Sequence, residues 1–195
     1  MPVTITPNAT TTMKGADGST PRIVGGSASA DVALASQSNA LYVLANQASF
    51  GDIVVVELSS PAVTPDQDIN HFMRIFARKD ATGAPVDVSC ELRQTYVSET
   101  SLGTLVATIV AQDVSTTITR YQHRLTVAEA ALITDYTAVQ FRFVLRQARS
   151  GSDAPASARI IYAELQVPQP VDNAVTILKT QAEIEGRFES VGAIY

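Results

Sequence analysis

Apolar and polar residues alternate along much of the chain after residue 38. The clearest runs with one apolar residue at every second position are Val86/Val88/Cys90/Leu92, Val139/Phe141/Phe143/Leu145 and Ile161/Ala163/Leu165/Val167. Because successive side chains of a strand point to opposite faces, this period predicts strands with one buried face. Strands are predicted over 40–46, 51–59, 70–79, 85–96, 102–112, 115–126, 137–148 and 157–167. About eight short strands separated by turns predict an all-β domain, an antiparallel, jelly-roll-like β-sandwich.

One stretch inside this domain has helical rather than strand character. Residues 126–135 begin with Thr126, and Glu129 follows three positions later. This spacing is that of a capping box, in which each side chain accepts a hydrogen bond from the other residue's backbone N–H. We therefore predict a short helix between two strands.

The two ends of the chain lack the alternation of the central domain. Residues 1–38 are rich in Thr, Ser, Gly and Ala, and we predict an extended N-terminal arm there, either disordered or ordered along a neighbouring subunit. The β-sandwich domain is predicted over 39–168. Pro168 and Pro170 cannot donate to a sheet, so the last strand ends there and 169–195 form a C-terminal tail, which is either a short helix or a loosely docked segment.

Composition narrows the classes of function. The 195 residues include 14 Lys and Arg against 19 Asp and Glu, a formal charge of −5, which argues against nucleic acid as a partner. A hydrophobic share of 46% supplies a core and excludes global disorder. Only 17% of residues are charged and the mean hydropathy is +0.12, so much of the surface is weakly polar and suited to burial against partners.

No combination of residues predicts catalysis, a cofactor or a metal. Cys90 is the only cysteine and alternates with core positions, while His71 and His123 stand apart from any ligand motif. Asp66 and Asp68 begin like a calcium loop, but the Gly and Glu that an EF-hand needs later are missing, so we expect a polar loop. No nucleophile and base lie at a recognisable spacing, and no phosphate-binding glycine loop occurs. We predict a protein that is not an enzyme.

Arginines at alternate strand positions are the most informative pattern. Four strand-face residues, Phe72, Arg74, Phe76 and Arg78, alternate with Met73, Ile75 and Ala77, and further arginine pairs fall on outward faces, Arg120 with Arg124 and Arg142 with Arg146. Burying the arginines would be costly, so we predict that the Met73 side is core and the Phe72 side faces outward. Such a face is either solvated or an interface, since Arg and aromatic residues are enriched where proteins meet. These eight Phe and Arg residues are our candidate interface, and charge reversal at Arg74 and Arg78 is expected to leave the monomer folded.

The central part of the chain resembles the small β-sandwich domains of bacteriophage virion proteins, such as head-decoration, neck and fibre components. The segments that carry this resemblance are Ile69–Asp80, Leu125–Tyr136 and Ala163–Pro168. The resemblance implies a phage structural protein, without identifying the part of the virion.

Together these observations predict a non-enzymatic structural subunit of a phage particle, with capsid cement or decoration as the expected role. Its expected partners are further copies of itself and other virion proteins such as the major capsid protein, with no nucleic acid and no membrane. The start of the chain lacks the features of a signal peptide, so we expect synthesis in the host cytoplasm and location in the virion. The alternatives are a tail, neck or fibre component, or a carbohydrate-binding β-sandwich module; the absence of Trp weakens the last.

Overall fold

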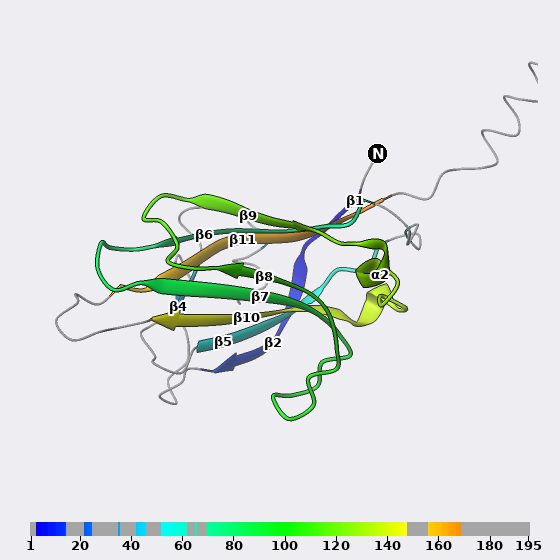
Figure 1. Ribbon diagram of the computed structural model, residues 1–195. Coiled ribbons are helices and arrows are strands. Elements are labelled where there is room, and N and C mark those ends of the chain that lie inside the picture. Colours follow the sequence, from blue (N-terminus) through cyan, green and yellow to red (C-terminus); the bar gives the residue numbers. More distant parts are fainter. Residues whose placement is uncertain are drawn as a thin grey trace, which may run out of the picture.

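The computed structural model describes residues 3–14, 22–24, 35, 42–45, 52–61, 65, 70–147 and 156–168 (Figure 1). Within these residues the chain is built almost entirely of strands. They are β1 (Val3–Ile5), β2 (Pro7–Lys14), β3 (Arg22–Val24), β4 (Tyr42–Ala45), β5 (Asp52–Leu58), β6 (Phe72–Lys79), β7 (Val86–Gln94), β8 (Thr104–Ala111), β9 (Thr119–Arg124), β10 (Val139–Gln147) and β11 (Ala158–Val167). The eight strands predicted from alternation correspond to β4 through β11.

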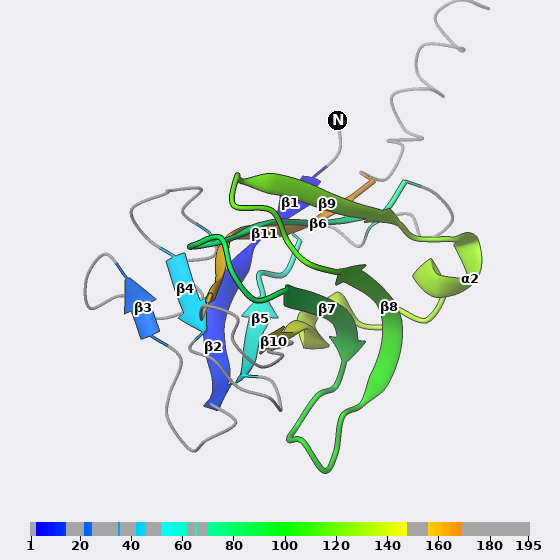
Figure 2. The same cartoon turned by 60° about the vertical axis from the view of Figure 1, so that its left-hand side comes forward.

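These eight strands form two antiparallel sheets that pack face to face. One sheet has the order β4-β11-β6-β9 and the other β5-β10-β7-β8. Each sheet thus pairs the strands of a long folded hairpin, β4 with β11, β5 with β10, β6 with β9 and β7 with β8. This wrapping is the connectivity of a jelly roll, so the predicted β-sandwich is confirmed. Figure 2 shows the two layers after a 60° turn, with β11, β6 and β9 in one and β10, β7 and β8 in the other.

We predicted a domain boundary after residue 38, but the beginning of the N-terminal segment belongs to the sandwich. β1 pairs with the end of β11, and β2 adds an edge strand beside β5. Ile5 lies in the core at 2% exposure. The prediction failed because β2 is a run of mostly Thr and small residues, which has too little apolar alternation to be recognised. The other residues of the predicted arm are outside the described part, apart from β3 and Ala35, and so is the predicted tail.

The core lies between the sheets, on the faces that the alternation predicts. The fully buried side chains include Met73, Ile75, Leu92, Phe141 and Phe143. The ring centroids of Phe141 and Phe143 lie 6.0 Å apart. Burial at alternate positions of β6 and β7 fixes the register, because a slip by one residue would turn every side chain to the other face.

The predicted helix is present but short. α2 spans Val127–Ala130, and the capping box between Thr126 and Glu129 is formed in both directions. A 3-10 turn follows at Tyr136–Ala138, with Asp135 accepting a hydrogen bond from the Thr137 N–H. Asp135 therefore begins a new turn rather than ending the helix. No helix in the described ranges is long and apolar enough to cross a membrane.

Candidate functional site

Six of the eight candidate interface residues lie on one surface, the outer face of the β6-containing sheet. Along β6, Met73, Ile75 and Ala77 are completely buried in the core. Phe72, Arg74, Phe76 and Arg78 alternate with them on the other side and are half-buried. The predicted register of β6 is therefore confirmed.

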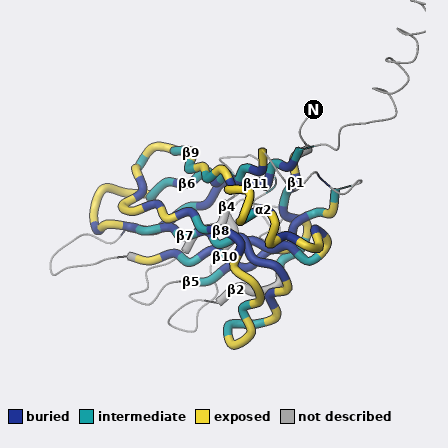
Figure 3. The backbone as a smooth tube through the Cα atoms, turned by 45° about the vertical axis from the view of Figure 1, so that its right-hand side comes forward, coloured by how far each residue is buried: buried dark blue, intermediate teal, exposed yellow. Residues whose placement is uncertain are grey.

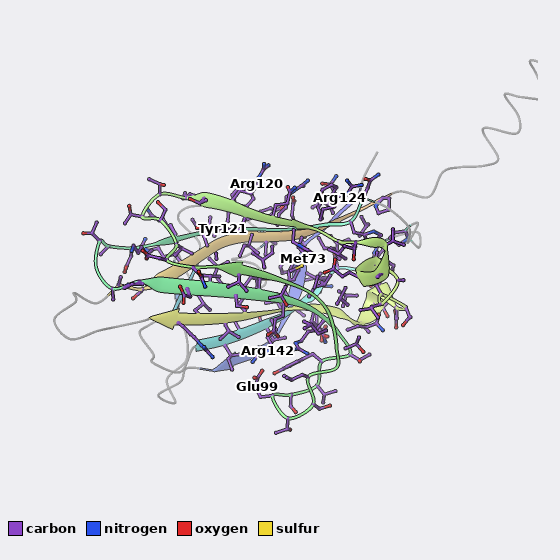
Figure 4. All side chains as sticks on the ribbon, in the orientation of Figure 1. Met73, Glu99, Arg120, Tyr121, Arg124 and Arg142 are labelled. Atoms are coloured by element: carbon purple, nitrogen blue, oxygen red, sulfur yellow. The ribbon has the colours of Figure 1, made fainter. Side chains whose placement is uncertain are left out.

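The neighbouring strand β9 supplies the exposed part of this surface. Arg120 lies opposite Phe76, Gln122 opposite Arg74, and Arg124 opposite Phe72. All three β9 side chains are exposed, whereas Tyr121 between them packs against the core. Figure 4 shows Arg120 and Arg124 along the outer edge of β9, with Tyr121 and Met73 toward the interior.

On the other side of β6, β11 completes the surface. Directly opposed pairs share a face, so Glu164 joins Arg74, Tyr162 joins Phe76 and Arg159 joins Arg78. A bulge between Ile160 and Tyr162 keeps both ends of β11 in this register. We call this surface, made of Phe72, Arg74, Phe76, Arg78, Arg120, Gln122, Arg124, Arg159, Tyr162 and Glu164, the cation–aromatic face.

Several contacts hold these side chains in place. Arg74 Nη1 donates to Glu164 Oε1 at 2.8 Å, and its Nε donates to Gln122 Oε1 at 2.7 Å, so Arg74 links three strands. The guanidinium groups of Arg74 and Arg124 lie 5.2 and 5.8 Å from the centre of the Phe72 ring. These distances suit cation–π attraction. Arg74 and Arg124 are thus oriented by neighbouring side chains of the sheet.

The charge of the cation–aromatic face is opposite to that of the whole protein. Among the described residues, Arg74, Arg78, Arg120 and Arg124 of this face share one carboxylate, Glu164, so these five side chains carry a formal charge of +3 on a chain whose total is −5. Arg78 lies directly opposite Arg159, and Arg78 Nε is buried without a hydrogen-bond partner among the described residues. Like charges directly opposite each other destabilise a sheet. These four arginines therefore concentrate more positive charge on this surface than Glu164 neutralises.

The remaining two candidate residues, Arg142 and Arg146, belong to β10 in the other sheet, so the eight candidates do not form a single surface. Arg142 contributes to a balanced network instead. Its Nε donates to Glu99 Oε1 at 2.9 Å and its Nη1 to Glu91 Oε2 at 3.0 Å. The same Glu91 oxygen accepts from Arg93 Nε at 2.6 Å. Two arginines and two glutamates therefore neutralise each other; Figure 4 shows Arg142 beside Glu99.

The network holds the loop between β7 and β8 against the sheet. Hydrogen bonds from Arg142 and from the Tyr96 hydroxyl, along with the nearby guanidinium charges, lower the pKa of Glu99 below its usual value. The same contact with Glu99 raises the pKa of Arg142. The loop closes at Gly103, whose φ is +65° and where a Cβ would overlap the carbonyl of Gln94.

Sequence reasoning missed the carboxylates that distinguish the arginines of the cation–aromatic face from those of the balanced network around Arg142. Glu91 and Arg93 alternate on β7, which places them on one face, but nothing along the sequence indicates that Arg142 lies opposite. Glu164 is a charged residue within the apolar strand β11, and that isolation was the available signal for a paired residue. Glu99 belongs to a loop and had no recognisable pattern.

The contacts of Cys90, His71 and His123 are those of residues that support the fold. Burial raises the pKa of the Cys90 thiol well above its ordinary value, which opposes thiolate formation. His71, just before β6, is buried with its Nε2 at 2.6 Å from the Tyr136 hydroxyl, and His123 contacts Glu129 at 3.0 Å. Among the described residues no group of His, Cys, Asp or Glu could hold a metal ion. Asp66 and Asp68 lie outside the described residues.

Comparisons with known proteins identify no family. No family model matches the chain, and no curated protein matches it. Among solved structures, it is similar to the CBM22-1 xylan-binding domain of Xyn10C from Paenibacillus barcinonensis, with 9% identity and a TM-score of 0.39 over 87% of this chain and 95% of that domain. A second similarity, to an aminopeptidase from a marine sediment Thaumarchaeota archaeon, has 7% identity and a TM-score of 0.28 over 86% of this chain and 33% of that one. Both TM-scores are too low to bear on function, and the architecture follows from the strand order itself.

Proposed function

We propose that this protein is a non-enzymatic structural subunit that binds an acidic surface of a neighbouring protein through its cation–aromatic face. The observation that supports this proposal is the excess of arginine over carboxylate on an ordered sheet face of an acidic protein. A partner carboxylate opposite Arg120 or Arg124 would form charge-assisted hydrogen bonds, and Arg124, which already lies against the Phe72 ring, would lose less freedom on binding. The resemblance to virion proteins leads us to expect a phage particle as the setting and capsid cement or decoration as the role.

The arrangement of the aromatic residues favours a protein partner over a sugar or a nucleic acid. Stacking on a sugar ring or a base needs an accessible ring face. Phe72 has two guanidinium groups nearby, and Tyr162 is buried at 5% exposure with its hydroxyl donating to Glu164. The most exposed groups of the face are instead the arginines and the glutamine of β9. Jelly rolls occur both in capsid proteins and in lectins, so the fold does not decide between these partners.

The proposal can be tested with capsids assembled without this protein. Wild type, Arg120→Glu and Arg146→Glu would be incubated with such capsids, and the bound fraction measured by co-sedimentation. The two variants make the same charge change at exposed arginines on opposite sheets. We expect Arg120→Glu to weaken binding by about tenfold or more, because a carboxylate would face the partner's acidic groups, while Arg146→Glu changes it by less than about twofold.

Two outcomes would contradict the proposal. Equal losses for the two variants would show that total charge, rather than this face, determines binding. A wild-type protein that does not bind capsids but is retarded by immobilised xylan in a gel would favour the carbohydrate-binding alternative.

A further inference from the structure

The strand β8 forms an edge of the second sheet and bears no charged residue. Its sequence, Thr-Leu-Val-Ala-Thr-Ile-Val-Ala, has neither proline nor glycine, and β7 is its only neighbour in the order of the described strands. From Ala107 to Ala111 it pairs regularly with β7. A regular edge strand presents unpaired backbone N–H and C=O groups to whatever lies beside it.

Other edge strands of the described sheets have features that oppose pairing. β9 bears Arg120 and Arg124, charges that would be desolvated by another strand. β2 contains Pro7 and two irregularities in its register. β3 has three residues, one of them Arg22. Charge, proline, bulges and short length are the usual protections of a sheet edge, and β8 has only a register shift near its first residues.

Two exposed large hydrophobic residues lie on β8, whereas the others of the described part lie outside this strand: Val97, Ile118, Val127 and Leu132. On β8 itself, Val110 is 62% and Leu105 is 46% exposed. α2, which bears Val127, contacts β8. Figure 3 shows exposed residues in the loop before β8 and around α2. Exposed apolar side chains on an edge strand, such as Leu105 and Val110, favour burial against a partner.

We propose that β8 pairs with β8 of a second copy of this chain, joining two five-stranded sheets into one continuous sheet. The unpaired backbone groups specify a strand as the occupant, and the absence of charge favours β8 itself. An antiparallel pair about a two-fold axis brings Leu105, Thr108 and Val110 of one copy opposite the same set in the other, with no like charges facing each other. Self-pairing of β9 would instead bring arginines together, and β8 against β9 would desolvate them.

This second interface uses a different sheet edge from the cation–aromatic face, although β8 contacts β9. It lies on the edge of the other sheet and is made by backbone hydrogen bonds and apolar contacts. A symmetric pair would present two cation–aromatic faces, and two linked binding sites raise the overall avidity for a multivalent surface. The dimer and the proposed docking to an acidic partner can therefore succeed or fail separately.

The test is the oligomeric state of Val110→Lys, measured by sedimentation velocity over a range of concentrations. Lysine on an edge strand hinders pairing, and the two-fold axis introduces it twice, so we expect dimerisation to weaken by about tenfold or more. Val97→Lys is the matched control, because it makes the same substitution at an exposed valine outside β8 and should leave the dimer intact. Melting temperatures confirm that both variants fold. A second control, Arg120→Glu with Arg124→Glu, should dimerise like wild type.

Hydrogen exchange supplies a readout that does not depend on a substitution. The β8 amides that do not donate to β7 should exchange rapidly at low protein concentration and slowly where the dimer is populated. A wild-type protein that stays monomeric at high concentration would overturn the proposal, as would a dimer unaffected by Val110→Lys. A dimer lost in the double arginine variant but kept in Val110→Lys would assign self-association to the cation–aromatic face instead.

Discussion

The outer faces of the two sheets both carry arginine at alternate strand positions, but the arginine charge is balanced on one face and in excess on the other. On β10 and β7, Arg142 and Arg93 meet Glu91 and Glu99, so the charges cancel within the fold. On β6 and β9, Arg74, Arg78, Arg120 and Arg124 share a single carboxylate among the described residues, Glu164 of β11. The first arrangement holds a loop and has little left for a partner. In the second arrangement the arginines repel one another, and their uncompensated charge is available for a partner. The number of nearby carboxylates, rather than the arginine pattern, therefore distinguishes a structural face from a candidate interface.

The largest expected effect comes from breaking the balanced network. Arg142→Ala leaves Glu91 and Glu99 without their shared partner in a site where the arginine side chain is only 11% exposed. We expect the free energy of unfolding, measured with urea, to fall by about 2–3 kcal/mol. Arg146 is the next outward arginine of the same strand and is exposed. Arg146→Ala should therefore change the free energy of unfolding by no more than about 0.5 kcal/mol. Similar losses for both would mean that the network is not what distinguishes Arg142.

Within the cation–aromatic face, the arginines differ in how far they are committed to the fold. Arg74 is paired with Glu164, with side-chain exposures of 22% and 11%, so Arg74→Glu sets two carboxylates together and should cost about 2 kcal/mol in unfolding free energy. Arg120→Glu, on the exposed strand β9, should cost less than about 0.5 kcal/mol. Urea titration of the two variants side by side makes the measurement. A harmless Arg74→Glu would show that this pair is solvated and that the whole face is free to bind.

This difference between Arg74 and Arg120 also marks what sequence could predict. Alternation gave the strands, the buried side of β6 and the outward direction of its arginines, because a period of two follows directly from backbone geometry. It treated Arg74 and Arg78 as equivalent and led us to expect that both could be reversed without loss. Their difference arises from Glu164, ninety positions away from Arg74, and pairing at that distance is set by the topology of the jelly roll.

The same limit applies to two further residues or segments. The strand β2 was missed because its polar sequence becomes a strand only through pairing with β5. Arg142 was grouped with the interface because its outward position on β10 was visible, whereas the glutamate that it binds in the β7–β8 loop was not. Local periodicity therefore predicts which way a side chain points, and only the fold decides what it meets.

Acid should weaken the balanced network. The contacts from Arg142 hold the pKa of Glu99 below its ordinary value in the folded protein. A carboxyl with a lowered folded-state pKa stabilises the fold above its unfolded-state pKa, and this contribution disappears as the pH falls through the folded-state pKa. The difference in unfolding free energy between wild type and Arg142→Ala should therefore be full near pH 7 and shrink below about pH 4. Urea titrations across this range make the test, and a constant difference would contradict the assignment.

The smallest effect concerns the aromatic part of the cation–aromatic face, where Phe72 lies beside the guanidinium groups of Arg74 and Arg124. Phe72→Leu keeps an apolar side chain but removes the ring near the Arg74 and Arg124 guanidinium groups. A double-mutant cycle with Arg124→Gln isolates the contact, and we expect a coupling of about 0.5 kcal/mol in unfolding free energy, because cation–π pairs at exposed sites are weak. The coupling should persist in salt better than the Arg74–Glu164 pair does, since a ring quadrupole acts only at short range. Zero coupling would mean that Phe72 merely covers the sheet, and that Arg124 is oriented by its hydrogen bond to Asn70 Oδ1 rather than by the ring.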